Sequence, residues 1–386
     1  MTMSGDSVSL AQQVQQALAR RDAAGAMALI RRAEAALPGD VDIKMQKALA
    51  LRVSGDLKGS IAALDEALAL EPYHFVALLS KGALVEQVQS ARHAAAIYKN
   101  ALSIAPSAPP PALQAPIARA RQVVAETAEA LEAFLATKVA GIAPETRPYV
   151  RERFEESLRI FAGSARPYYS EAALLPYAQL PQIAFYDRDL FPWFAELEAA
   201  TDMIRGELEG ALAQAETDFA PYIAYPPGAP VNQWEELNHS RKWSSYFLWK
   251  DGIRQDAACE RCPGTAALLD RLPMAHQPGF APTAMFSALT PHTHIPAHSG
   301  STNTRLLTHL PLILPGPARF RVGNITRDWK LGEAWAFDDT INHEAWNDAD
   351  QLRVILIIDI WNPYLTEAER QLVSAMMTAK NEFFSA

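Results

Sequence analysis

The chain has 386 residues, 49% of them hydrophobic and 20% charged, a length and composition typical of a folded protein of two or three domains rather than a disordered one. The net charge of -9 offers no general basic surface for phosphates, which argues against a nucleic-acid partner. The first 18 residues lack the features of a secretory signal, and no later stretch has the roughly eighteen apolar residues of a membrane span. We therefore expect a cytoplasmic protein without a membrane span.

A regular period marks the first part of the chain. Prolines recur every 34 residues, and an alanine lies five positions before each of them. The prolines are Pro38, Pro72 and Pro106, and small residues recur in the same phase at Ala26, Ser60 and Ala94. A plain helical bundle also uses alanine at helix contacts, but it has no reason to keep one period through three units. The pattern resembles the tetratricopeptide repeat over about residues 7–108, which implies a helical solenoid with a groove for an extended peptide or partner protein.

A proline-rich segment, residues 105–116, follows the repeats. Proline removes a backbone donor and clashes with the preceding turn, so this segment predicts a boundary that no helix crosses. Residues 117–139 and 149–162 then have the composition of helices. We predict a repeat domain over residues 1–112, a helical connector over 113–164 and a third domain over 165–386.

The last part of the chain is rich in aromatic residues and short strand candidates, with one helix expected near residues 194–213. The expected strands are residues 243–250, 283–289, 304–314, 318–322, 334–337 and 352–361. This pattern favours an antiparallel sandwich or barrel with flanking helices, so the whole chain is α+β. Strands that return in a jelly roll bring residues distant in sequence to one mouth.

The two cysteines, Cys259 and Cys262, form a Cys-x-x-Cys pair far from the histidine-rich segment. They supply at most two of the four ligands of a structural zinc, so we expect a structural or incidental role. A local disulfide stays open as an alternative, although nothing in the sequence indicates an oxidising compartment.

Five of the nine histidines lie between positions 292 and 343, which indicates a metal site. His298 and His343 are the leading ligands; iron oxygenases usually add a carboxylate two residues after the first histidine, where this chain has Gly300. Each histidine also has an ordinary alternative, a turn cap for His298 and a buried ring satisfied by an aspartate for His343. His292 and His294 are further ligand candidates, although two nearby prolines favour turn or mouth positions for them.

Several longer motifs accompany the histidines in this part of the chain. They are FYDRDLFPW at residues 185–193, RKWSSYFLW at 241–249, HSGSTN at 298–303, FDD at 337–339, HEAW at 343–346 and DIWNP at 359–363. Together they resemble the aspartyl/asparaginyl β-hydroxylase family over about residues 165–370, a family that also lacks the carboxylate ligand. The resemblance implies a double-stranded β-helix that uses Fe(II), 2-oxoglutarate and O2.

The resemblance also implies roles for individual residues. His298 and His343 would bind the iron, Arg353 would hold the distal carboxylate of 2-oxoglutarate, and Ser287 and His309 would be further cosubstrate contacts. A guanidinium matches a carboxylate with two parallel hydrogen bonds, which suits the first of these assignments. Arg353 read alone is also compatible with a surface charge at a strand end, but strand alternation places it on one face with two isoleucines.

Strand alternation adds Arg305, which shares a face with His309 and is therefore a further candidate for contact with the cofactor. Family members carry another arginine at the position of Leu307, and its absence here removes a plausible anchor for an acidic substrate. Asp338 and Asp339 either orient His343 or belong to an ordinary turn. Two tryptophans, Trp243 and Trp346, are candidates for walls that exclude water.

Our hypothesis is a dioxygenase that hydroxylates a peptide or protein side chain, Asp/Asn-type β-hydroxylation included, with the substrate delivered by the repeats. The same chemistry on a free amino acid, a small peptide or a lipid acyl chain is an alternative. A third reading, motivated by Gly300 and Leu307, is a catalytically inactive repeat-containing scaffold.

Overall fold

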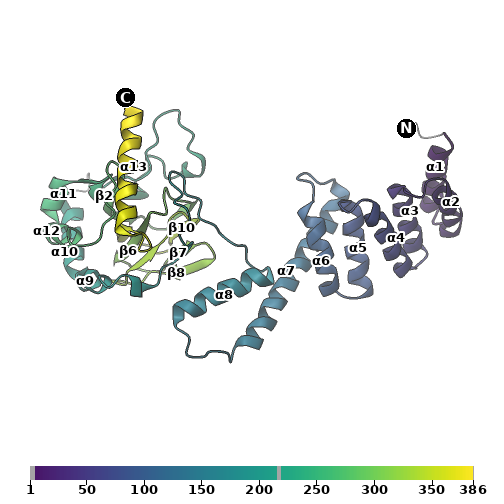
Figure 1. Cartoon of the computed structure of the whole chain (residues 1–386), viewed down its shortest axis with the longest axis horizontal. Coiled ribbons are helices and arrows are strands. Elements are labelled where there is room, and N and C mark those ends of the chain that lie inside the picture. Colours follow the sequence, from purple (N-terminus) through teal and green to yellow (C-terminus); the bar gives the residue numbers. More distant parts are fainter. Residues whose placement is uncertain (1–4, 215–218, 386) are drawn as a thin grey trace. The chain divides into compact units, whose positions relative to one another are not determined.

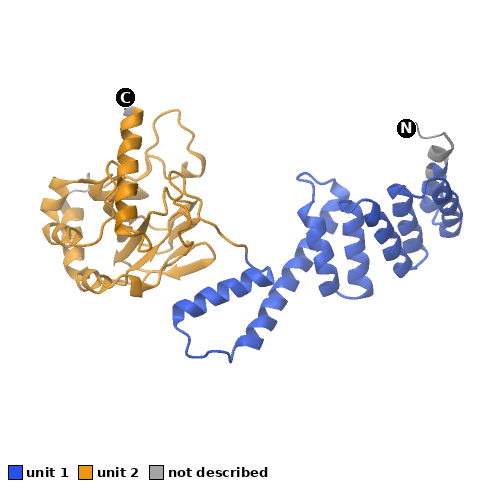
Figure 2. Cartoon of the chain, in the orientation of Figure 1, with its two compact units in different colours: residues 1–165 blue, residues 166–386 orange. Residues whose placement is uncertain are grey.

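The structure, a computed structural model, describes residues 5–214 and 219–385. The chain divides into two compact units, Met1–Ala165 and Arg166–Ala386 (Figure 2). The segment expected as a separate connector belongs to the first unit, together with the repeats. Figure 1 shows a first unit made of helices and a second that combines strands with helices.

The first unit begins with three helix pairs, as the 34-residue period predicts. They are α1 (Gly5–Ala19) with α2 (Ala23–Ala36), α3 (Val41–Val53) with α4 (Leu57–Leu70), and α5 (Phe75–Val88) with α6 (Ala91–Ser103). The recurrent small residues Ala26, Ser60 and Ala94 are at most 1% exposed, and the Ser60 hydroxyl donates to the Ala48 carbonyl of the paired helix at 2.7 Å. Gly55 makes the turn between α3 and α4 with φ of +86°. The tetratricopeptide-like repeats are therefore confirmed.

Two further helices complete this unit, α7 (Pro111–Val139) and α8 (Pro148–Ala162). The expectation that no helix enters residues 105–116 is wrong, because α7 starts at Pro111 and contains Pro116. The physical reason is position. Pro111 lies in the first turn, where a proline loses an N–H that has no partner within the helix and its fixed φ suits a helix start. This reason does not apply to Pro116, which lies beyond the first turn.

The second unit is built on two antiparallel sheets. The larger sheet has the order β1-β2-β4-β11-β6-β9, with β3 paired to β2, and the smaller has the order β5-β10-β7-β8. The larger sheet contains β1 (Ala220–Pro221), β2 (Trp243–Lys250), β3 (Ile253–Arg254), β4 (Ala284–Leu289), β6 (Arg305–Ile313), β9 (Trp335–Phe337) and β11 (Arg353–Trp361), and the smaller contains β5 (Thr293–His298), β7 (Ala318–Val322), β8 (Ile325–Asp328) and β10 (His343–Asn347). This is the double-stranded β-helix expected from the family resemblance, and the chain as a whole is α+β.

Helices cover the outer face of the larger sheet. They are α9 (Phe194–Ala199), α10 (Thr201–Gln214), α11 (Asp256–Arg261) and α12 (Pro263–Leu269). A separate C-terminal helix, α13, spans Glu367–Ser385. Residues of α9 to α12 share one apolar core with the outward side chains of β2, β4, β6 and β11. The single helix expected over 194–213 is divided in two: α9 ends at its C-cap Ala200, and α10 begins at Thr201.

A second apolar core lies between the two sheets and surrounds the cavity described below. Both cysteines are buried free thiols of the outer core rather than a disulfide, and burial raises the pKa of Cys262 to about 12. A structural role is therefore the better account of the pair. Within the described ranges, no helix combines the length and apolarity needed to cross a bilayer.

Candidate active site

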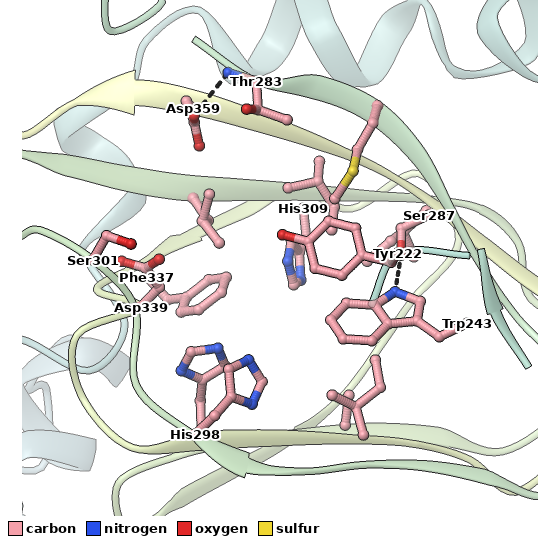
Figure 3. A pocket seen from close by; sticks show the side chains of 18 of the residues that line it. Tyr222, Trp243, Thr283, Ser287, His298, Ser301, His309, Phe337, Asp339 and Asp359 are labelled. Carbon is pink, nitrogen blue, oxygen red and sulfur yellow. Dashed lines mark hydrogen bonds between the residues drawn. The ribbon is translucent and has the colours of Figure 1, made fainter. Parts of the chain in front are cut away.

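A cavity of about 440 Å³ lies between the two sheets. All six residues assigned to the site from the sequence line it: Ser287 from β4, His298 from β5, Arg305 and His309 from β6, His343 from β10 and Arg353 from β11. The antiparallel strand returns thus collect residues that are up to 66 positions apart in the sequence. In Figure 3, His298 and His309 lie on different sides of the same space, with Asp339 and Ser301 at one end and Ser287 and Trp243 at another.

The two proposed ligands face each other across neighbouring strands. His298 and His343 are register partners of β5 and β10, and their ring centroids are 4.1 Å apart. The Nδ1 atom of His298 is 2.7 Å from the carbonyl oxygen of Pro296, and that of His343 is 3.0 Å from the carbonyl oxygen of Ile341. A carbonyl only accepts, so each Nδ1 carries the proton and each Nε2 keeps its lone pair. This tautomer is the one a metal-binding imidazole needs.

The charge state agrees with that role. Burial lowers the pKa of His298 to about 3, with the neighbouring His343 as the next cause, and burial lowers the pKa of His343 to about 4. Both rings are therefore neutral at physiological pH, as a ligand must be. Among the described residues, no group of three or more His, Cys, Asp or Glu side chains is arranged to hold a metal, so this site offers two imidazoles.

The surroundings of Gly300 explain why the chain has no carboxylate two residues after His298. A Cβ atom at this position would lie 2.0 Å from Oδ2 of Asp339, so the Asp339 carboxylate occupies the space that a side chain at 300 would need. Asp338 instead accepts hydrogen bonds from the backbone N and the hydroxyl of Thr340, at 2.9 and 2.6 Å. The carboxylates of these aspartates do not hold the His343 ring; the ring bonds to backbone carbonyls, those of Ile341 and Asp339.

Arg353 is a buried cation without an anion. Its side chain is 1% exposed, no described carboxylate forms an ion pair with it, and its Nε and Nη1 have no hydrogen-bond partner. Its guanidinium stacks on Trp329 at 4.6 Å from the ring centroid. Burial lowers the pKa of Arg353 to about 9. An uncompensated buried charge is costly, so this arrangement suits an anionic ligand.

Two polar groups adjoin this end of the cavity. Ser287 accepts a hydrogen bond from Nε1 of Trp243 at 3.0 Å and keeps its own hydroxyl proton for another acceptor (Figure 3). His309 is buried, and its Nδ1 has no hydrogen-bond partner. Burial, followed by the positive charge of Arg353, holds the pKa of His309 well below its usual value, so this ring is neutral. The hydroxyl proton of Ser287 and the unpaired Nδ1 of His309 are therefore available to a carboxylate-bearing cosubstrate.

Arg305 has a different environment from Arg353. Its Nη1 is 3.2 Å from Oδ2 of Asp339 and 3.3 Å from Oδ1 of Asp359. Asp359 also accepts a hydrogen bond from the backbone N of Thr283 at 2.7 Å (Figure 3). These ion pairs balance the charge of Arg305, while its Nε and Nη1 form no hydrogen bond, and its assignment as a cofactor contact stays a prediction.

Three sequence-based candidates lie outside the cavity wall. His294 is on β5 but its Nε2 contacts Glu344 at 2.9 Å and its ring stacks on Trp346, while Nε2 of His292 contacts Asp350 at 2.9 Å. Trp346, expected as a possible wall, thus belongs to the outer face of the smaller sheet, whereas Trp243 does line the cavity.

Sequence reasoning assigned no role to Asp359 or Trp329. Alternation along β11 could have found Asp359, because it shares a face with Arg353, Ile355 and Ile357 in an otherwise apolar strand. Trp329 lies just after β8 in a connection without periodicity, and no sequence signal marks it as the platform under Arg353.

Comparisons with known proteins found a matching family and several relatives. The family model described as aspartyl/asparaginyl beta-hydroxylase matches residues 198–363. An ornithine lipid ester-linked acyl 2-hydroxylase from Rhizobium tropici is 36% identical over 233 residues, which cover 59% of this chain and 75% of that protein. The human aspartyl/asparaginyl beta-hydroxylase is 37% identical over 187 residues, which cover 48% of this chain and 24% of that protein. A solved structure of the Sgt2 TPR domain from Aspergillus fumigatus is similar with a TM-score of 0.29 and 17% identity, over 32% of this chain and 82% of that chain.

The fold and the site thus define a double-stranded β-helix protein of the hydroxylase class, preceded by tetratricopeptide-like repeats. The chain belongs to the aspartyl/asparaginyl β-hydroxylase family, and the resemblance read from the motifs is confirmed.

Proposed function

We propose that this protein is an Fe(II)- and 2-oxoglutarate-dependent dioxygenase that hydroxylates an unactivated C–H bond. The observation that carries the proposal is the buried, unpaired guanidinium of Arg353 in the same cavity as two imidazoles with free Nε2 lone pairs. In this proposal His298 and His343 hold the iron, Arg353 binds the distal carboxylate of 2-oxoglutarate, and Ser287 and His309 border that carboxylate. The metal and cosubstrate supply the oxidising chemistry when bound.

The protein's own residues position the reactants and exclude water. Backbone carbonyls two residues before each histidine fix the tautomer and the ring direction, so both lone pairs are available without reorganisation. Trp243 forms part of the wall and directs the Ser287 hydroxyl proton away from itself, because its indole N–H already occupies one lone pair of that oxygen. Arg353 gains a partner only when a carboxylate binds, so its desolvation favours occupancy by an anion.

For the substrate, we propose a peptide or protein side chain, supported by the repeats. The first unit contains three helix pairs, and stacked helix pairs of this kind generally expose a concave surface that binds extended segments. A lipid acyl chain is the second candidate, and a specific comparison favours it. The relative of which this chain covers 75% is named as a lipid acyl 2-hydroxylase, whereas the match covers 24% of the human protein hydroxylase.

Anaerobic titration with Fe(II) and 2-oxoglutarate tests the proposal. We expect a weak visible charge-transfer band from the chelate, and succinate after oxygen is admitted. The band should be lost in His298→Ala and His343→Ala, while Arg353→Ala should keep iron binding but lose cosubstrate affinity. A band that survives both histidine changes would refute the ligand assignment, and absence of succinate with peptide, amino-acid and lipid substrates alike would favour the inactive scaffold.

The substrate alternatives separate by deletion of residues 1–110. If the repeats deliver a peptide or protein, the shortened chain should lose turnover of that substrate and keep turnover of a small one. Equal loss for both substrates, with 2-oxoglutarate binding retained, would assign the repeats another task.

A further inference from the structure

The two arginines of the cavity lie at opposite ends of strand β11. Arg353 begins this strand, while Arg305 is the register partner of Trp361 at its other end. If Arg353 holds the cosubstrate, as in the proposed function on which this inference rests, the Arg305 end is left for the substrate. Its charge and polarity then decide which substrate fits.

The Arg305 end carries more negative than positive charge. Arg305 is 11% exposed and forms ion pairs with Asp339 and Asp359, two carboxylates that are themselves buried. When both carboxylates are ionised, one cation between two anions leaves a net charge of -1. Burial raises the pKa of both carboxylates, that of Asp359 to about 6, so this charge is present above that pH. Asp251, an exposed residue of the lining, adds a third carboxylate toward solvent. A substrate carboxylate here would add a further negative charge at low dielectric, with no unpaired cation among the described lining residues at this end.

Apart from a few hydroxyl groups, the remaining wall at this end is apolar and aromatic. Leu307 faces the cavity and is the register partner of Asp359, so the side chain beside that carboxylate is aliphatic. Phe280 lies under the guanidinium of Arg305, at 5.6 Å from the ring centroid, and Tyr222 completes the wall. Such a surface gains free energy when it covers alkyl groups, and its hydroxyl groups, that of Tyr222 among them, carry no charge that could balance an acid.

We propose that the substrate of this protein presents an uncharged alkyl group at the reacting carbon and carries no carboxylate within reach of Arg305. Arg305 is then a positioning residue that holds Asp339 and Asp359 in place, rather than an anchor for an acidic substrate. The same geometry tolerates a cationic group farther out, opposite Asp251.

Three probes of equal chain length test the proposal: octan-1-ol, octylamine and octanoate. Binding of each to the full chain is measured by ligand-observed NMR, with 2-oxoglutarate at saturation so that Arg353 is occupied. We expect octanol and octylamine to bind and octanoate to bind at least about tenfold more weakly. Octanoate that binds as tightly as octanol, or a failure of all three to bind, would overturn the proposal.

Two variants test the electrostatic cause. Asp359→Asn keeps an acceptor for the backbone N of Thr283 but removes one negative charge, so octanoate affinity should rise about tenfold while octanol affinity stays the same. Leu307→Arg places a cation beside Asp359 and should shift the preference in the same direction. Unchanged 2-oxoglutarate affinity shows that each variant is folded. No change in octanoate affinity in either folded variant would contradict the stated cause.

A failure of this inference can be told apart from a failure of the proposed function. Calorimetry of 2-oxoglutarate alone, with wild type and Arg353→Ala, reports on the function. If that binding depends on Arg353 and octanoate still competes equally with octanol, only the substrate inference is wrong.

Discussion

The carboxylate of Asp339 occupies the space of a side chain that Gly300 does not have. A Cβ on Gly300 would lie 2.0 Å from Oδ2 of Asp339, and this same oxygen contacts Arg305 at 3.2 Å. A side chain at position 300 and the buried Asp339–Arg305 ion pair therefore exclude each other, because both need the same space.

This arrangement predicts that side chains at position 300 are not tolerated. Gly300→Ala should destabilise the protein by roughly 1–3 kcal/mol, because Asp339 must move in a packed interior. Gly300→Asp should cost more, since it also adds a buried negative charge. Urea denaturation measures both effects. The double variant Gly300→Asp with Asp339→Gly exchanges the two positions and should recover part of the loss; a Gly300→Ala protein as stable as wild type would contradict this account.

Arg353 gives a prediction in which stability and ligand binding change in opposite directions. Arg353→Met removes an uncompensated buried charge, so without ligand the variant should be more stable than wild type by on the order of 1–3 kcal/mol. It should also lose the stabilisation that 2-oxoglutarate confers on wild type. Thermal unfolding with and without 2-oxoglutarate measures both. Arg319→Met, at an exposed ion pair with Asp348, is the matched control. A large loss of ligand-free stability in Arg353→Met would mean that the guanidinium is satisfied within the protein.

Much of this architecture is readable from the sequence because it depends on local or periodic signals. The 34-residue period specified three helix pairs, and apolar runs located β2, β4, β6, β7, β9 and β11 to within a residue or so of their ends. The strands that carry the two proposed metal ligands, His298 and His343, were not recognised. In β5, Pro296 interrupts the pattern and is tolerated because β5 is at the edge of its sheet. In β10, the inward positions His343 and Asn347 are polar, which hides the alternation.

The site shows the same division between local and tertiary information. The motifs grouped the six cavity residues, but the partners of the two arginines were not predictable. Arg305 meets Asp339 and Asp359 only through the pairing of strands distant in sequence. Trp329 reaches Arg353 through a connection that no periodicity describes.

The histidine tautomers are open to direct measurement. In metal-free protein at pH 7.5, nitrogen-15 NMR should show both rings protonated at Nδ1 and unprotonated at Nε2, because each Nδ1 faces a carbonyl. With pKa values near 3 and 4, both rings should stay neutral down to about pH 5, where free imidazole in the same sample is protonated. Protonation of either ring near its ordinary value of 6.5 would show that it is not enclosed.

The same shifts make stability depend on pH. The folded pKa values of His298 and His343 lie below the unfolded value of 6.5, so the unfolded chain takes up protons first as the pH falls. Metal-free protein should therefore lose stability between about pH 6.5 and pH 4. The double change of His298→Gln and His343→Gln should flatten this part of the profile in urea denaturation. A profile of unchanged slope would exclude these two rings as its cause.

Asp338 should contribute the opposite slope. Burial raises its pKa from 3.8 to about 6, despite the hydrogen bonds from Thr340, so the folded chain holds this proton more tightly than the unfolded chain. Stability is then lost as the pH rises from 3.8 through 6, and the cost is complete above that range. Asp338→Asn keeps an oxygen for Thr340 and removes the charge, so at pH 7.5 it should be more stable than wild type by roughly 1–3 kcal/mol. The difference should nearly vanish at pH 4. Asp350→Asn, whose side chain is 94% exposed, is the control and should show no such divergence. Equal stability of Asp338→Asn and wild type at pH 7.5 would mean that this carboxylate is fully compensated by its hydrogen bonds.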